Sequence, residues 1–193
     1  MLYKAIEISL SALLLVPVFA VLNKVRFKNA RDTVCYYVFA VYLSAVYLFV
    51  GLPTLQFMRF EVSLTLVPFL PMLSDVRNTL LNVLLFMPLG FLLPLLWARY
   101  PGLKETVLFG LVMSASIELL QILTYRATDI NDIIANTLGT ALGYLAFRIM
   151  ARLIPSARKR AKSKSEASVI FLSVFTVMFF IQPYAATLFY MLT

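Results

Sequence analysis

Six apolar stretches of about twenty residues each divide this chain, and charged residues, prolines or glycines separate them. A helix rises about 1.5 Å per residue, so about 20 residues cross a hydrocarbon core that is about 30 Å thick. The pattern therefore predicts an all-α, polytopic membrane helix bundle with about six transmembrane helices. The predicted spans are residues 5–23, 33–52, 78–97, 105–124, 131–150 and 168–190.

The connection between the second and third spans, residues 52–77, is apolar where most loops are polar. It contains the run LTLVPFLPML at residues 64–73. Pro68 and Pro71 interrupt helical hydrogen bonding, so a full crossing of the membrane is not expected here. We predict a re-entrant or interfacial segment, with a disordered loop as the alternative.

Composition supports a membrane protein and narrows its chemistry. Hydrophobic residues make up 62% of the 193 residues and charged residues 13%, against about 25% charged in a typical soluble domain. We treat residues 1–193 as a single domain. Cys35 is the one cysteine and the chain has no histidine, which excludes disulfide frameworks, thiolate zinc sites and imidazole catalysis. We expect no cofactor and no metal.

The first span could be mistaken for a secretory signal. Lys4 precedes an apolar run at residues 8–22, as in a signal peptide. However, the run lacks the small residues of a cleavage site, and residues 23–31 continue it with positive charge. We predict a retained transmembrane span.

Charge distribution predicts the orientation in the membrane. Thirteen lysines and arginines lie in the segments 24–31, 99–104 and 148–164, and four lie on the opposite side of the predicted bundle. The positive-inside rule then places the basic loops in the cytoplasm and both termini outside. The basic run at residues 158–164 lies between two spans, so we expect it to contact anionic lipid rather than nucleic acid.

Polar residues in the third, fourth and fifth spans are predicted to meet at one depth. The third and fifth spans run inward and the fourth runs outward, so their polar ends all lie toward the outer leaflet. Asn78 and Asn82 are four residues apart and share a helix face, and Glu118 and Gln121 share another. The candidate ligand-binding residues are Arg77, Asn78, Asn82, Glu118, Gln121, Arg126, Asp129, Asp132 and Asn136.

The fifth span carries its polar residues and its glycines on one face. Asp132, Asn136, Gly139 and Gly143 follow the spacing i, i+4, i+7, i+11, and GTALG is a small-xxx-small pattern that allows close helix packing. In the third span, proline and glycine predict a kink. The candidate helix-packing residues are Pro88, Gly90, Gly139 and Gly143.

Two interpretations of the polar residues compete. Each ionised group at bilayer depth costs about 2.5–3.5 kcal/mol on insertion scales, so such groups either pair or serve a function. Arg126 could pair with Asp129 or Asp132, and the amides could join helices. However, three acids (Glu118, Asp129 and Asp132) outnumber the two available cations, Arg126 and Arg77. The remaining carboxylate would need a proton, a metal ion or a ligand. We favour a ligand-binding cavity.

Catalysis and assembly are the alternatives to ligand binding. Carboxylates with an asparagine could act as general acid and base or hold Mg²⁺ or Ca²⁺, which would suit an intramembrane enzyme with a lipid-linked substrate. No nucleophile motif or phosphate-binding loop accompanies them. A scaffold subunit would instead use the polar face to dock another membrane protein. We expect binding rather than catalysis.

Two motifs resemble the VanZ-like family of bacterial membrane proteins. They are NVLLFMPLGFLLPLL at residues 82–96 and SIELLQILTYRATDINDIIANTLGTALGY at residues 116–144, and LVPFLP at residues 66–71 is similar to a further element of the family. The signature region covers about residues 64–150. The family's polar signature falls on Asn82, Pro88, Gly90, Glu118, Gln121, Arg126, Asp129, Asp132, Asn136, Gly139 and Gly143.

The resemblance implies an integral membrane protein of the bacterial cell envelope. The family's named member is associated with reduced susceptibility to teicoplanin, a lipid-bearing glycopeptide antibiotic, and no agreed catalytic activity comes with the family. The expected partners are membrane lipid and an amphiphile of the envelope, either a lipid-linked cell-wall precursor or the lipoglycopeptide. The sequence leaves the oligomeric state open.

Overall fold

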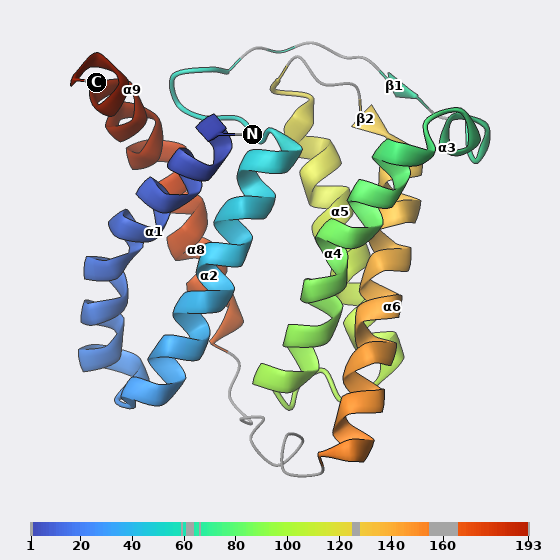
Figure 1. Cartoon of the computed structure of the whole chain (residues 1–193), viewed down its shortest axis with the longest axis horizontal. Helices are drawn as coiled ribbons and strands as arrows, with labels where there is room; N and C mark the ends of the chain where they lie inside the picture. Colours follow the sequence, from blue (N-terminus) through green and yellow to red (C-terminus); the bar gives the residue numbers. More distant parts are fainter. Residues whose placement is uncertain are drawn as a thin grey trace. The chain divides into compact units, whose positions relative to one another are not determined.

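The computed structural model describes residues 2–58, 60, 64–65, 67–124, 128–154 and 166–192 (Figure 1). Helices dominate this part of the chain, with two π-helical turns and one pair of two-residue strands. The elements are α1 (Leu2–Leu22), η1 (Asn23–Phe27), α2 (Ala30–Val50), β1 (Leu64–Thr65), α3 (Leu70–Ser74), α4 (Val76–Leu96), α5 (Leu103–Gln121), β2 (Thr128–Asp129), α6 (Ile130–Leu153), α8 (Ala167–Thr176), η2 (Val177–Ile181) and α9 (Gln182–Leu192).

Within the described residues, five helical stretches are long and apolar enough to cross a membrane. The fourth predicted span, residues 105–124, corresponds to α5, which is not among these five; it has 19 residues and includes Lys104, Glu105 and Glu118. The predicted all-α polytopic membrane helix bundle is confirmed, and helix boundaries agree with the predicted spans within a few residues. The five stretches are Tyr3–Phe27, Ala30–Val50, Val76–Leu96, Ile130–Leu153 and Ala167–Leu192.

The helices pack into two compact units. Unit 1 joins the two ends of the chain, Met1–Arg59 and Glu166–Thr193, and contains α1, η1, α2, α8, η2 and α9. Unit 2 is the continuous segment Phe60–Ser165 and contains β1, α3, α4, α5, β2 and α6. All the described candidate site residues therefore belong to unit 2.

In unit 1, α1 and α2 form an antiparallel pair, and both ends of the chain lie at the same end of the unit (Figure 1). The Tyr37 hydroxyl donates a hydrogen bond to the Ala12 carbonyl oxygen at 2.8 Å, and the Lys4 ammonium donates to the Leu48 carbonyl oxygen at 3.1 Å. Two charged or polar side chains of this hairpin thus bond to backbone carbonyls of the other helix, which satisfies them within an apolar surrounding.

In unit 2, α4 and α6 run side by side in the same direction, and glycines set their distance (Figure 1). A Cβ atom added to Gly139 would overlap the carbonyl oxygen of Val83, and one added to Gly143 would overlap that of Met87. The contact is reciprocal, because a Cβ atom on Gly90 of α4 would overlap the backbone of α6. The two backbones are therefore in direct contact, as the small-xxx-small pattern predicted.

Helix α5 runs in the opposite direction and packs on α6 through small and polar residues (Figure 1). A Cβ atom added to Gly110 would overlap the side chain of Thr140. Thr106, Ser114 and Glu118 lie on the same face of α5 and are buried. These residues are eight and four residues apart, which places them on one helix face, so α5 presents a polar stripe to the interior of unit 2.

The apolar segment before α4 contains no spanning helix in its described residues. Strand β1 pairs in parallel with β2, with Leu64 opposite Thr128. Helix α3 has five residues, which is far too short to cross a bilayer. Phe69 and Leu73 have 62% and 75% of their surface exposed. The described part of the segment thus lies at one end of unit 2, with Phe69 and Leu73 exposed.

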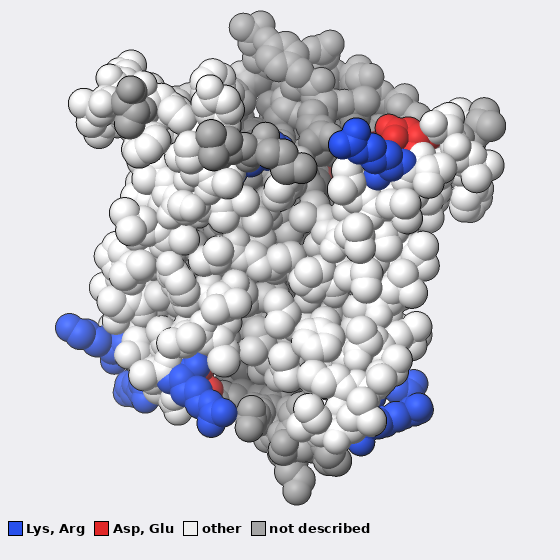
Figure 2. Space-filling view, viewed as in Figure 1, with Lys and Arg blue, Asp and Glu red and all other residues white. Residues whose placement is uncertain are grey.

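On the face drawn in Figure 2, the charged side chains lie toward the helix ends, and uncharged side chains cover the surface between them. Between the helix ends, the exposed residues are largely aliphatic and aromatic; in unit 2 they include Leu84, Leu108, Leu138 and Leu145. An apolar face between charged ends is the surface expected of a bundle that lipid surrounds.

Replacing Gly143 by valine should force α4 and α6 apart. The added Cβ meets a backbone oxygen of α4, which cannot rotate away, so we expect a loss of about 1–3 kcal/mol in the free energy of unfolding. Thermal unfolding of the purified protein in detergent measures the effect. Leu142→Val, at an exposed neighbouring position, is the control and should change little. Equal unfolding temperatures for the two variants would contradict the proposed contact.

Candidate functional site

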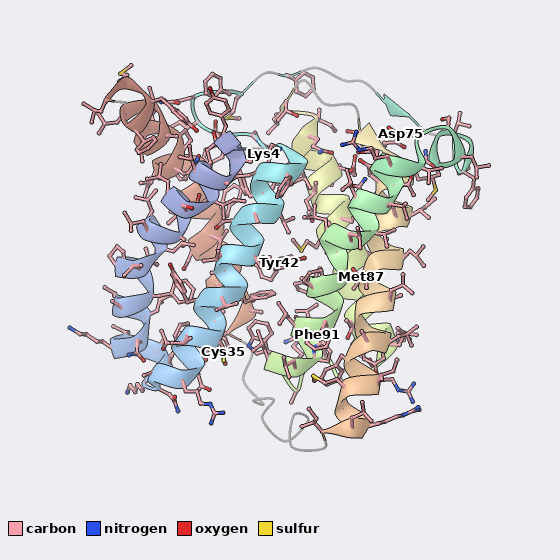
Figure 3. The ribbon with its side chains drawn as sticks, viewed as in Figure 1. Lys4, Cys35, Tyr42, Asp75, Met87 and Phe91 are labelled. Atoms are coloured by element: carbon pink, nitrogen blue, oxygen red, sulfur yellow. The ribbon has the colours of Figure 1, made fainter. Side chains whose placement is uncertain are left out.

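Acids and amides from α4, α5 and α6 meet at one end of unit 2, where α4 and α6 begin and α5 ends. Asp75, labelled in Figure 3, marks this end at the start of α4. Strands β1 and β2 lie at the same end. We call the set the polar cluster; it comprises Asn82, Ser114, Glu118, Gln121, Asp129, Asn131, Asp132 and Asn136.

Glu118 joins α5 to the start of α6. Only 2% of its surface is exposed, and its Oε2 accepts a hydrogen bond from the Asp129 backbone N–H at 2.8 Å. Its carbonyl oxygen accepts a bond from the Thr128 hydroxyl at 3.0 Å. A carboxylate bonded to an N–H at the beginning of a helix is stabilised both by the bond and by the helix dipole. Glu118 therefore positions β2.

Asp129 caps α6. Its Oδ1 accepts a hydrogen bond from the Asn131 backbone N–H at 2.8 Å and from the Asn131 side-chain amide at 2.7 Å. Aspartate is a favoured residue at this position because its side chain satisfies an N–H that has no partner inside the helix. Asp129 as a whole is half-buried, so it is partly accessible from outside unit 2.

Asn131 connects the polar cluster to the apolar segment that precedes α4. Its Oδ1 accepts a hydrogen bond from the Phe69 N–H at 2.8 Å, and its Nδ2 donates to the Val67 carbonyl oxygen at 2.9 Å. Phe69 has a φ of 66°, a left-handed conformation that is strained for a residue with a side chain. The buried amide of Asn131 thus holds this turn in place.

The role of Asn131 was not predicted from the sequence. It lies outside the stripe formed by Asp132 and Asn136, and spacing along one helix cannot reveal a bond to a segment more than sixty residues away. The sequence does contain a hint: polar residues are frequent at residues 129–132, and Asp or Asn at the start of a helix often caps it.

Asp132 connects α6 to α4. The Asn82 Nδ2 donates a hydrogen bond to Asp132 Oδ1 at 2.6 Å, and both side chains are half-buried. Asp132 also lies in the first turn of α6, where the helix dipole favours negative charge. These two predicted site residues are therefore brought together, on the side of α6 that faces α4.

Asn136 lies deeper in unit 2, between α6 and α5. Its Nδ2 donates a hydrogen bond to the Ser114 hydroxyl at 2.9 Å, and 2% of its surface is exposed. Its Oδ1 is buried and has no hydrogen-bond partner among the residues that the structure describes. A buried acceptor of this kind is costly unless a donor reaches it.

The remaining predicted site residues divide by location. Gln121 is buried at the end of α5, with 3% of its surface exposed. Arg77 and Asn78 lie at the same end of unit 2, in the first turn of α4, but both are exposed. Arg126 lies outside the described residues. Pro88 is half-buried within α4, and the three candidate glycines form the α4–α6 contact described above.

The acids of the cluster do not form a metal-binding group within the described ranges. No three histidine, cysteine, aspartate or glutamate side chains among these residues lie close enough to hold a metal ion. The cluster presents carboxylate and amide oxygens at the end of three helices. The N–H groups of Asp129 and Asn131 at the start of α6 already donate to carboxylates of the cluster.

Comparisons with known proteins identify relatives of this chain. The sequence model of the VanZ/LLP1 family matches residues 33–151. The curated protein called "Protein VanZ" from Enterococcus faecium is 39% identical over 82 residues, which cover 42% of this chain and 50% of that protein. The chain thus spans about half the length of this relative. No solved structure gives a significant match.

Replacing Asn131 by alanine should release the turn at residues 67–69. The change removes three side-chain hydrogen bonds of a buried amide, and the Phe69 N–H loses its acceptor. We expect rapid hydrogen–deuterium exchange at the Phe69 amide and a loss of about 1–3 kcal/mol in the free energy of unfolding. Asn78→Ala, at an exposed amide of α4, is the control. Slow exchange at Phe69 in the Asn131 variant would refute this role.

Proposed function

This chain belongs to the VanZ/LLP1 family of membrane proteins, and we propose that its polar cluster binds an amphiphilic molecule of the bacterial cell envelope. The candidates are a lipid-linked cell-wall precursor and a lipoglycopeptide of the teicoplanin type. Binding would lower susceptibility to the antibiotic. The basic loops would face the cytoplasm, both termini would lie outside, and the cluster would lie near the outer surface of the membrane.

The observation that carries this proposal is the graded exposure of the cluster. Glu118, Gln121 and Asn136 are buried, whereas Asn82, Asp129 and Asp132 are half-buried. The buried members fix the helix ends, and the half-buried members place two carboxylates and an amide where a ligand can reach them. The two acids also stabilise the start of α6, and their partial exposure leaves them accessible at the end of the apolar helices.

The available side chains suit a ligand with both polar and acyl parts. Carboxylates accept hydrogen bonds from sugar hydroxyls and ammonium groups, and the exposed Arg77 provides a positive charge for phosphate. Phe69 and Leu73, which are exposed beside the cluster, can cover an acyl chain. Arg126 is proposed as a second cation of the same site.

Asp132→Asn tests the site with little structural change. The new amide oxygen can still accept the hydrogen bond from Asn82, while the negative charge is lost. We expect the teicoplanin inhibitory concentration of a strain that expresses the variant to fall to that of the strain without the gene. Membrane immunoblotting confirms equal expression.

Glu105→Gln is the matched control, because it removes the same charge from the first turn of α5, at the opposite end of unit 2. It should keep the protection given by the unchanged protein. Full protection by Asp132→Asn would refute the proposed site. Loss of protection in a metal chelator, restored by Mg²⁺, would instead support the enzymatic alternative.

A further inference from the structure

A cavity lies at the end of unit 2 opposite the polar cluster, between the beginning of α5 and the end of α6. Its volume is 420 Å³, within the range of about 300–1,000 Å³ that is usual for small-molecule sites. Gly102 and Leu103 contribute the α5 side of its wall, and Tyr144, Phe147, Arg148 and Arg152 contribute the α6 side. None of these residues belongs to the polar cluster.

The base of the cavity is apolar and well supported. Tyr144 and Phe147 are each 5% exposed. The Tyr144 hydroxyl donates a hydrogen bond to the Pro101 carbonyl oxygen at 3.3 Å, which connects α6 to the loop before α5. Phe91, labelled in Figure 3 on α4, packs edge-on against Phe147 with ring centroids 6.2 Å apart. These contacts fix the two aromatic side chains at the base of the cavity.

The rim of the cavity is cationic. Arg148 and Arg152 are four residues apart, so both guanidinium groups extend from the same face of α6. Both are exposed, and neither forms an ion pair with a residue that the structure describes. The first turn of α5 carries Glu105, whose Oε2 lies beside Gly102 on the same wall, so the positive charge of the rim comes from Arg148 and Arg152.

We propose that this cavity binds the phosphate of an anionic phospholipid headgroup. Two guanidinium groups can each donate paired N–H bonds to phosphate oxygens, and neither is ion-paired with a carboxylate in the described part of the chain. The cavity lies at the end of α6, which is long and apolar enough to cross a membrane, so a bilayer that α6 spans would place its headgroups near this end. Basic pockets between transmembrane helices are known headgroup sites. The apolar base would contact the glycerol and the first acyl carbons.

Titration of the purified full chain with short-chain phosphatidylglycerol in a neutral detergent tests this site, with native mass spectrometry as the readout. Saturable binding is expected, together with much weaker binding of short-chain phosphatidylcholine. Affinity for phosphatidylglycerol should fall about fivefold in Arg148→Ala and about thirtyfold in the Arg148→Ala/Arg152→Ala variant. Thermal unfolding without lipid should be unchanged, because both side chains are exposed.

Arg99→Ala is the matched control. Arg99 is an exposed arginine at the same end of unit 2 but lines a different cavity, of 310 Å³. It should change the affinity less than twofold. An equal loss in Arg99→Ala and Arg148→Ala would show unspecific attraction and overturn the site. Inorganic phosphate that binds as tightly as the lipid would overturn the assignment to a headgroup.

Discussion

The backbone contact between α4 and α6 is the constraint on which unit 2 depends. Gly139 and Gly143 lie directly against carbonyl oxygens of α4, so no layer of side chains separates the two backbones there. This close contact fixes the position of one helix along the other. A shift of one helical turn would place a Cβ-bearing residue at the contact and move Asp132 about 5.4 Å from Asn82. Glycines in the middle of the helices thus determine which polar side chains meet at their ends.

The start of α6 explains how acids can be held at the end of apolar helices. Glu118 accepts from the Asp129 N–H, Asp129 accepts from the Asn131 N–H, and Asp132 lies in the same first turn. The unpaired N–H groups of a helix start carry partial positive charge, and their effect is strong where water is scarce. The acids therefore stabilise the start of α6, in addition to any role in binding a ligand.

Much of this arrangement could be predicted from the sequence, because it depends on local pattern. Apolar length predicted the spans, residue spacing predicted the glycine face, and two motifs predicted the VanZ-like family, which is confirmed. The bond from Asn131 to the turn at Phe69 could not be predicted, since it joins distant segments. Nor could the sequence predict that Glu118 is buried whereas Asp132 is half-buried. The single-domain assignment and the ligand-binding roles stay predictions.

The order in which the two units can be completed follows from the chain segments that form each of them. A ribosome releases every residue of unit 2 before Glu166 emerges, whereas unit 1 needs α8 and α9 from the end of the chain. Arg26, in the turn after α1, forms its ion pair with Glu166. The α1–α2 pair is therefore synthesised before α8 and α9, the helices that complete its unit, and all of unit 2 is synthesised in between.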